Sequence, residues 1–328
     1  MRDPIDLKQS ERSRSRGSVQ IGLAILTVIG IIIASIVVFQ PFSSTQPPTT
    51  THGTTLTVGG TSDVEGQLLT KLYTLLLRKA GFTVNEKPAV VDSSKLFPAL
   101  QNGSIDIYPE FTFTGLQWLG IASAHDSQKD YQTVKNGFQQ RFKITWLDPA
   151  PLNDGYTFCT SQDEAAQLHI NTISDLAPQV PGLILASNND GIALVDSLKS
   201  VYNFDTHSFK SLLVYTLEGI SFDALDNNQA QINVCYITDA SAKTRNFVFL
   251  IDDKNGFPQF HPAPLVRDDV LHKNPAIANT LNPLAPKLTT DVSIRLQARV
   301  QQLKSSGTSS SDAITQVATN FLTNQGLL

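Results

Sequence analysis

Strand-like and helix-like patterns alternate from Thr54 onward, and this alternation constrains the fold more than any other feature of the chain. The run "TLTVGG" is typical of a strand, and residues 65–81 follow with leucines spaced for an amphipathic helix that ends at a glycine. Further strand-like runs, "IDIY", "YTFCT", "GLILAS" and "QINVCYI", are separated by helical stretches. The pattern predicts an α/β fold with mostly parallel sheets.

The chain of 328 residues is too long for one small core and suits two lobes. "FPALQNGSIDIYPEF" and "FDALDNNQAQINVCYI" share Phe-x-Ala-Leu, an Asn-containing turn and a strand that ends in tyrosine, and they fall in different halves. Each half would therefore direct an aromatic strand end toward a cleft, where open parallel sheets bind ligands. "FVFLIDDKNGFPQF" predicts a hairpin around "DKNG", and the tail from Asp268 is predicted to be helical.

The N-terminal part has a different composition. Residues 19–39 form an uncharged apolar run, about 31 Å long as a helix, which is enough to cross a bilayer. Arg12, Arg14 and Arg16 precede it, so residues 1–18 are predicted to be cytoplasmic and the chain after the anchor extracytoplasmic. A cleaved signal peptide is the alternative, but its apolar core would be shorter and a small-residue cleavage site would follow. Residues 40–53 are predicted to form a flexible linker.

Composition excludes some classes of partner. With 25 basic and 29 acidic residues the chain carries a formal charge of −4, which argues against binding to nucleic acid. Cys159 and Cys235 would lie in an oxidising space. The sequence is compatible both with a disulfide between them and with two buried free thiols.

Catalytic patterns are weak. The six histidines are scattered without metal-ligand spacing, and the sequence has no Gly-rich phosphate loop and no nucleophile elbow. Glu110 could act as a base, although such a carboxylate more often caps a helix or pairs with a lysine. We therefore expect neither an enzyme nor a cofactor.

A binding interpretation fits "DIYPEFTFTG" better, because the segment gathers aromatic rings and threonine hydroxyls at a strand end. Aromatic faces attract cations, and a quaternary ammonium group has no N–H to donate. The alternative is that these aromatic side chains are part of the core.

The segment resembles "DLYPEYTGTG" of the substrate-binding proteins of ABC transporters for osmoprotectants such as glycine betaine, choline and carnitine (the OpuBC/OpuCC type). "RFKITWLDPAPLNDGYTFCT", "CYITDA" and "LIDDKNGFPQFHPAPLVRDDVLHKNPAI" are similar to further segments of that family, so the likeness runs from Leu56 to the C-terminus.

The resemblance implies a two-lobed periplasmic-binding-protein fold of the second type, with two mixed sheets, that closes on its ligand by a hinge. The first lobe would comprise residues 54–154 and 261–328, and the second 155–260. The partners would be a quaternary amine, an ABC permease and its ATPase. A membrane-anchored sensory domain for a related amine is the alternative.

The resemblance also implies the binding residues. The aromatic cage would be Phe111, Tyr156, Phe222 (with Tyr215 as a substitute) and Tyr236, and Thr114 and Thr61 would add polar contacts. The chain departs from the family pattern where Phe replaces Tyr in the cage and where "TDAS" lacks the usual arginine. A betaine carboxylate therefore has fewer evident partners than the hydroxyl of a choline-like alcohol.

Overall fold

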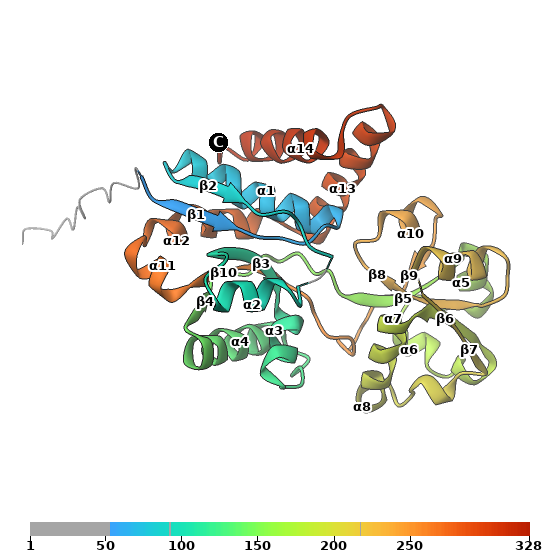
Figure 1. Cartoon of the computed structure of the whole chain (residues 1–328). Helices are drawn as coiled ribbons and strands as arrows, with labels where there is room; N and C mark the ends of the chain where they lie inside the picture. The colour runs from blue at the N-terminus through green and yellow to red at the C-terminus, as the bar shows by residue number, and fades with distance from the viewer. Residues whose placement is uncertain (1–52, 92, 217) are drawn as a thin grey trace, which may run out of the picture. The chain divides into compact units, whose positions relative to one another are not determined.

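The first of two five-stranded sheets has the order β2-β1-β3-β10-β4 in the computed structural model, which describes residues 53–91, 93–216 and 218–328 (Figure 1). Its strands are β1 (Thr55–Val58), β2 (Thr83–Glu86), β3 (Ile107–Phe111), β4 (Ile144–Trp146) and β10 (Pro262–Arg267). β1 pairs in parallel with β2 and β3, whereas β10 pairs antiparallel with β3 and β4. The sheet is therefore mixed rather than mostly parallel.

Helices from both ends of the described chain pack around this sheet, and α13 and α14 pack on α1 (Figure 1). They are α1 (Val64–Lys79), α2 (Leu96–Gln101), α3 (Thr112–Leu119), α4 (Ser127–Phe142), α11 (Asp268–Lys273), α12 (Ala276–Leu281), the 3-10 segment Asn282–Lys287, α13 (Thr290–Ser305) and α14 (Ser310–Asn324). Leu69, Leu72 and Leu76 of α1 recur at helical spacing and are buried with Leu281 of α12 in one core cluster. The C-terminal helices thus complete the core around the first strand–helix unit.

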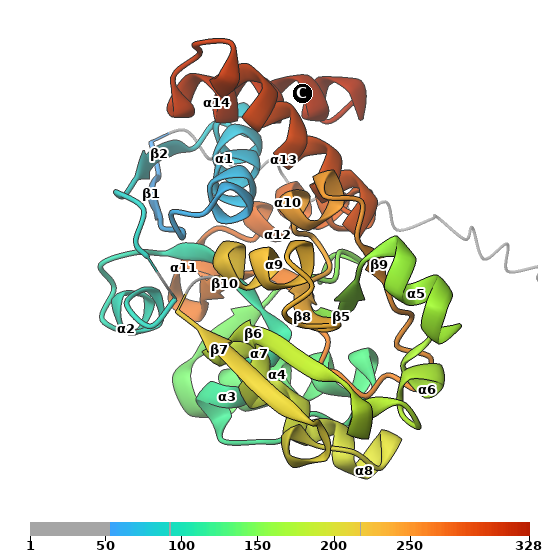
Figure 2. The ribbon, with the colours of Figure 1, turned by 90° about the vertical axis from the view of Figure 1, so that its right-hand side faces the viewer.

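The second sheet has the order β7-β6-β8-β5-β9, which can be followed in Figure 2. Its strands are β5 (Tyr156–Thr160), β6 (Ile184–Asn188), β7 (Ser211–Tyr215), β8 (Ile232–Tyr236) and β9 (Val248–Phe249). Its helices are α5 (Gln162–Leu168), α6 (Ile173–Leu176), α7 (Asn189–Val195), α8 (Lys199–Tyr202), α9 (Glu218–Asp226) and α10 (Ala240–Thr244), with 3-10 turns at Val180–Gly182, Asp196–Leu198 and Thr206–Ser208.

The two sheets repeat one arrangement. The third strand, β3 or β8, has a parallel neighbour on one side and an antiparallel neighbour, β10 or β5, on the other. The Phe-x-Ala-Leu copies place α2 before β3 and α9 before β8. The predicted α/β architecture with two lobes and two mixed sheets is therefore confirmed.

Two crossover segments, 147–155 and 250–261, connect the sheets and are hydrogen-bonded to each other. The Asp154 N–H donates to the Phe260 carbonyl at 3.0 Å, and the Phe260 N–H donates to Asn153 Oδ1 at 2.8 Å. The Thr112 N–H donates to the His261 carbonyl at 3.0 Å, which joins the second crossover to the end of β3. These bonds place the last residue of β3 and the first residue of β5 beside the same two crossover segments.

The hairpin predicted at 247–260 is wrong, because β9 ends at Phe249 and pairs with β5 instead of a returning strand. The Asp252 carboxylate accepts hydrogen bonds from the Gly256 and Phe257 N–H groups, both at 2.8 Å, and from the Tyr202 hydroxyl. The "DKNG" turn is thus folded around a carboxylate, and the chain leaves it as a crossover.

Cys159 of β5 and Cys235 of β8 form a disulfide, which resolves the alternative that the sequence left open. Their Cα atoms are 5.9 Å apart, within the range of disulfides, and both residues are fully buried. The bond joins two paired strands across 76 residues of sequence.

Among the described residues, no helix combines the length and the apolar character needed to cross a membrane. The anchor predicted at 19–39 lies outside the described residues, as do the segments on either side of it up to His52.

We predict that replacing both half-cystines, Cys159→Ala with Cys235→Ala, lowers the free energy of unfolding by about 2–4 kcal/mol, because the unfolded chain regains the freedom of a long loop. Urea unfolding with and without reductant measures the effect. Reduction should shift the wild-type midpoint and leave the double variant unchanged, and a wild-type midpoint insensitive to reductant would contradict the prediction.

Candidate ligand-binding site

A cavity of about 570 Å³ lies where strand ends and loops of both sheets meet, and its size is typical of small-molecule sites. Its lining combines aromatic rings, hydroxyls, amides and carboxylates from both lobes. The lining residues include Thr61, Asp63, Glu65, Ser93, Glu110, Phe111, Thr114, Asp154, Tyr236, Thr238, Asp239, Phe260, Gln297 and Gln301.

The first lobe contributes Phe111 and Thr114 from the junction of β3 and α3. Phe111 keeps an extended backbone and is the N-cap of α3, so the chain turns directly from strand to helix at this residue. Thr114 follows in the first helical turn.

Thr61 lies on the loop between β1 and α1, which is tightly packed. A Cβ atom on Gly66 would collide with the Thr61 hydroxyl, so the glycine permits the helix to start against this loop. The Asp63 carboxylate caps α1 by accepting from the Gly66 N–H at 2.7 Å.

The second lobe contributes Tyr236, the last residue of β8. Tyr156 stands opposite it in the antiparallel register, and the two ring centroids are 4.0 Å apart. The Phe260 ring lies 6.0 Å from Tyr156 and 4.9 Å from Phe113. Tyr236 and Phe260 face the cavity, whereas Tyr156 is 3% exposed and is not among the lining residues.

The structure brings together four of the six predicted site residues, because Thr61, Phe111, Thr114 and Tyr236 all line the cavity. Tyr156 stacks on Tyr236. The roles of these residues as ligand contacts stay predictions.

Phe222 is not brought to the cavity. It is fully buried in a cluster with Cys159, Cys235 and Phe247, and its ring centroid is 5.7 Å from that of Phe247. The residue faces the interior because α9 packs across β6, β7 and β8. The substitute, Tyr215, packs against the same cluster.

Five carboxylates line the cavity, and none of the described lining residues is a lysine, an arginine or a histidine. Two of the five are helix caps: Asp63 caps α1, and Asp239 accepts from the Ser241 and Ala242 N–H groups at the start of α10. Of this acidic set, the sequence drew attention only to Glu110, because the five carboxylates come from four separate segments of the chain that only the fold brings together.

Glu65 and Asp154 are held where ionisation is costly. Burial, followed by the charges of Asp154 and Asp63, raises the pKa of Glu65 well above its usual value. Burial also raises the pKa of Asp154 to about 7, and Asp63 and Asp239 act in the same direction. The Thr238 hydroxyl donates to Asp154 Oδ1 and opposes the shift.

Glu110 is 1% exposed, and burial raises its pKa to about 7. Its Oε1 accepts from the Phe111 N–H at 2.8 Å, and its Oε2 accepts from the Tyr108 hydroxyl at 3.1 Å. The carboxyl therefore holds the end of β3 in place and pairs with no lysine in the described structure.

This chemistry suits a cation. Aromatic faces and carboxylates both attract positive charge, so the lining suits an organic cation. The described residues contain no group of three or more His, Cys, Asp or Glu side chains that could hold a metal ion.

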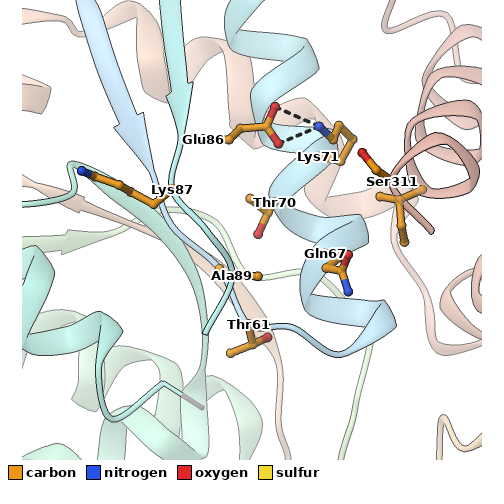
Figure 3. A pocket seen from close by; sticks show the side chains of 10 residues that line it. Thr61, Gln67, Thr70, Lys71, Glu86, Lys87, Ala89 and Ser311 are labelled. Carbon is orange, nitrogen blue, oxygen red and sulfur yellow. Dashed lines mark hydrogen bonds and ion pairs between the residues drawn. The ribbon is translucent and has the colours of Figure 1, made fainter. Parts of the chain in front are cut away.

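A second cavity, of about 120 Å³, shares Thr61 with the first among its lining residues (Figure 3). Its polar lining includes Thr70, Lys71 and Glu86. The Lys71 ammonium is bonded to both oxygens of Glu86 at 2.6 and 2.8 Å, as the dashed lines show. The small volume and the internal ion pair make it a weaker candidate.

The fold and the cavity define a two-lobed solute-binding protein of the periplasmic type. Residues 54–324 match the family of the substrate-binding domain of ABC-type glycine betaine transport systems, and the chain belongs to this family. Its relatives are substrate-binding transport proteins rather than enzymes, as the sequence predicted.

The chain is 30% identical over 241 residues to the carnitine transport binding protein OpuCC of Listeria monocytogenes, covering 72% of this chain and 78% of the relative. It is 28% identical over 255 residues to the glycine betaine-binding protein YehZ of Escherichia coli K12, covering 74% and 84%. A crystal structure of a glycine betaine/carnitine/choline ABC transporter superposes with a TM-score of 0.69 at 24% identity, covering 83% of this chain and 99% of that one, and this shows the shared fold.

We predict that stability falls as pH rises through the titration of Glu110. A carboxyl whose pKa is raised on folding is more protonated in the folded state, so it stabilises below its ordinary pKa of about 4.3 and loses this contribution as pH passes about 7. Relative to Glu110→Gln, the wild-type free energy of unfolding should drop by about 2–3 kcal/mol between pH 5 and pH 8. Urea unfolding at both pH values measures this difference, and parallel profiles for the two proteins would refute it.

Proposed function

We propose that this chain is the extracytoplasmic substrate-binding protein of an ABC transporter, that it captures a quaternary amine of the choline, glycine betaine and carnitine class between its lobes, and that it delivers the amine to a permease. The apolar run at 19–39 would anchor it to the membrane, and an ATPase would drive the permease. The family assignment supports the transport role.

One observation carries the ligand class. Aromatic strand ends from both sheets, Phe111 of β3 and Tyr236 of β8, line one cavity together with Phe260. A quaternary ammonium group offers no N–H, so aromatic faces and negative charge are the means by which a protein can hold it. Each well-placed face contributes roughly 0.5–2 kcal/mol.

Isothermal titration calorimetry of the wild-type protein with choline, glycine betaine, carnitine and proline betaine tests the proposal. At least one of them should bind with a measurable heat. The absence of heat from all four, up to millimolar concentrations, would reject the proposed ligand class.

Tyr236→Ala should weaken binding of the best of these ligands at least about tenfold, since a tenfold loss corresponds to about 1.4 kcal/mol, within the roughly 0.5–2 kcal/mol that one aromatic face contributes. Tyr156→Ala should have an effect of similar size, because it removes the ring that supports Tyr236. Tyr215→Ala is the matched control, because Tyr215 ends β7, which β6 separates from β8, and does not line the cavity. Equal affinities of the wild type, Tyr236→Ala and Tyr156→Ala would place the ligand elsewhere.

A further inference from the structure

Glu65 has an unused hydrogen-bonding atom at the cavity. The residue lines the cavity although it is only 6% exposed, and its Oε1 atom has no hydrogen-bond partner in the described structure. Its Oε2 accepts from Gln297 Nε2 of α13 at 3.0 Å, and the nearby Thr238 and Ser293 hydroxyls act on the same carboxyl by lowering its pKa. A buried carboxylate oxygen without a hydrogen-bond partner costs free energy. A ligand that donates a hydrogen bond to it would therefore bind more tightly.

The charges around Glu65 also favour a ligand that donates hydrogen bonds and carries no negative charge. Asp154 lies near enough for its charge to act on Glu65, and Asp63 and Asp239 complete an acidic wall that has no basic counterpart among the described lining residues. A ligand carboxylate at this wall would face like charges.

The helix ends at the wall are already occupied. Backbone N–H groups at the start of α1 and α10 donate to Asp63 and Asp239, so these carboxylates take the places where an anionic group would bind. The start of α3 has no side-chain cap and is the competing position for a ligand carboxylate.

Building on the proposed function, we propose that Glu65 and Asp154 form a subsite for a hydrogen-bond donor of the ligand, and that the preferred ligand is a quaternary ammonium alcohol with net positive charge and no carboxylate. The ammonium group lies against Phe111, Tyr236 and Phe260, and the hydroxyl donates to Glu65 Oε1. Betaines, which are zwitterions, bind more weakly.

Three ligands of nearly equal size test this by calorimetry on the wild-type protein: choline, its O-methyl ether and glycine betaine. The ether keeps the charge and loses the O–H, whereas glycine betaine carries a carboxylate in place of the terminal CH2OH group of choline. Choline should bind at least about tenfold more tightly than either, as expected for a lost bond to a charged group. Glycine betaine binding as tightly as choline or more tightly overturns the inference and leaves the proposed function standing, whereas no binding of any quaternary amine overturns both.

Glu65→Gln keeps the shape of the side chain and removes its charge. It should reduce the preference for choline over glycine betaine at least about fivefold, and Asp154→Asn should act in the same direction. Asp163→Asn, an exposed charge on α5 away from the cavity, is the matched control and should leave the preference unchanged. A preference unaffected by Glu65→Gln overturns the assignment of Glu65.

Proton exchange gives a readout that needs no variant. A cation bound in the cavity beside Glu65 and Asp154 lowers their pKa values, so choline binding near pH 7 should release protons. A betaine carboxylate that accepts a bond from protonated Glu65 would instead take protons up. The other charged groups near the pair are Asp63 and Asp239, and α13 presents the uncharged Ser293 and Gln297. Calorimetry in buffers of different ionisation enthalpy measures the sign, and proton uptake with choline overturns the subsite.

Discussion

The hydrogen bonds between the two crossover segments are the constraint on which the site depends. The main chains of Asp154 and Phe260 are joined, and Asn153 bonds to the N–H groups of both Gly155 and Phe260. Tyr156 is the first residue of β5 in the second sheet. His261 directly precedes β10 in the first sheet. Because the crossovers are tied together, the ends of β3 and β8 and the crossover residues Asp154 and Phe260 line one cavity.

Much of the architecture could be predicted from local patterns. The leucine spacing of α1, the caps of α13 and α14 and the repeated Phe-x-Ala-Leu units are short-range signals, and each is found where the sequence predicted a helix or a strand. The segment after Phe249 was mispredicted because the bonds of Asp252 to the Tyr202 hydroxyl and to nearby backbone N–H groups depend on tertiary structure.

The site was predictable only where aromatic residues stand at strand ends. Phe111 and Tyr236 follow apolar runs and could be placed at a cleft, whereas Phe222 sits on a helix whose orientation the sequence leaves open. The acidic wall could not be predicted, since Glu65 meets Asp154 and Asp239 only once the chain is folded. The cysteine pairing likewise depends on the antiparallel register of β5 and β8.

The shared strand order of the two sheets has an evolutionary consequence. Phe111 and Tyr236 end equivalent third strands, and each packs against a different core cluster, so a substitution at one strand end acts first on the packing of its own half. Such a protein can change what it recognises one half at a time. Successive changes in opposite halves offer a gradual route between solutes, along which the chain remains folded at every intermediate.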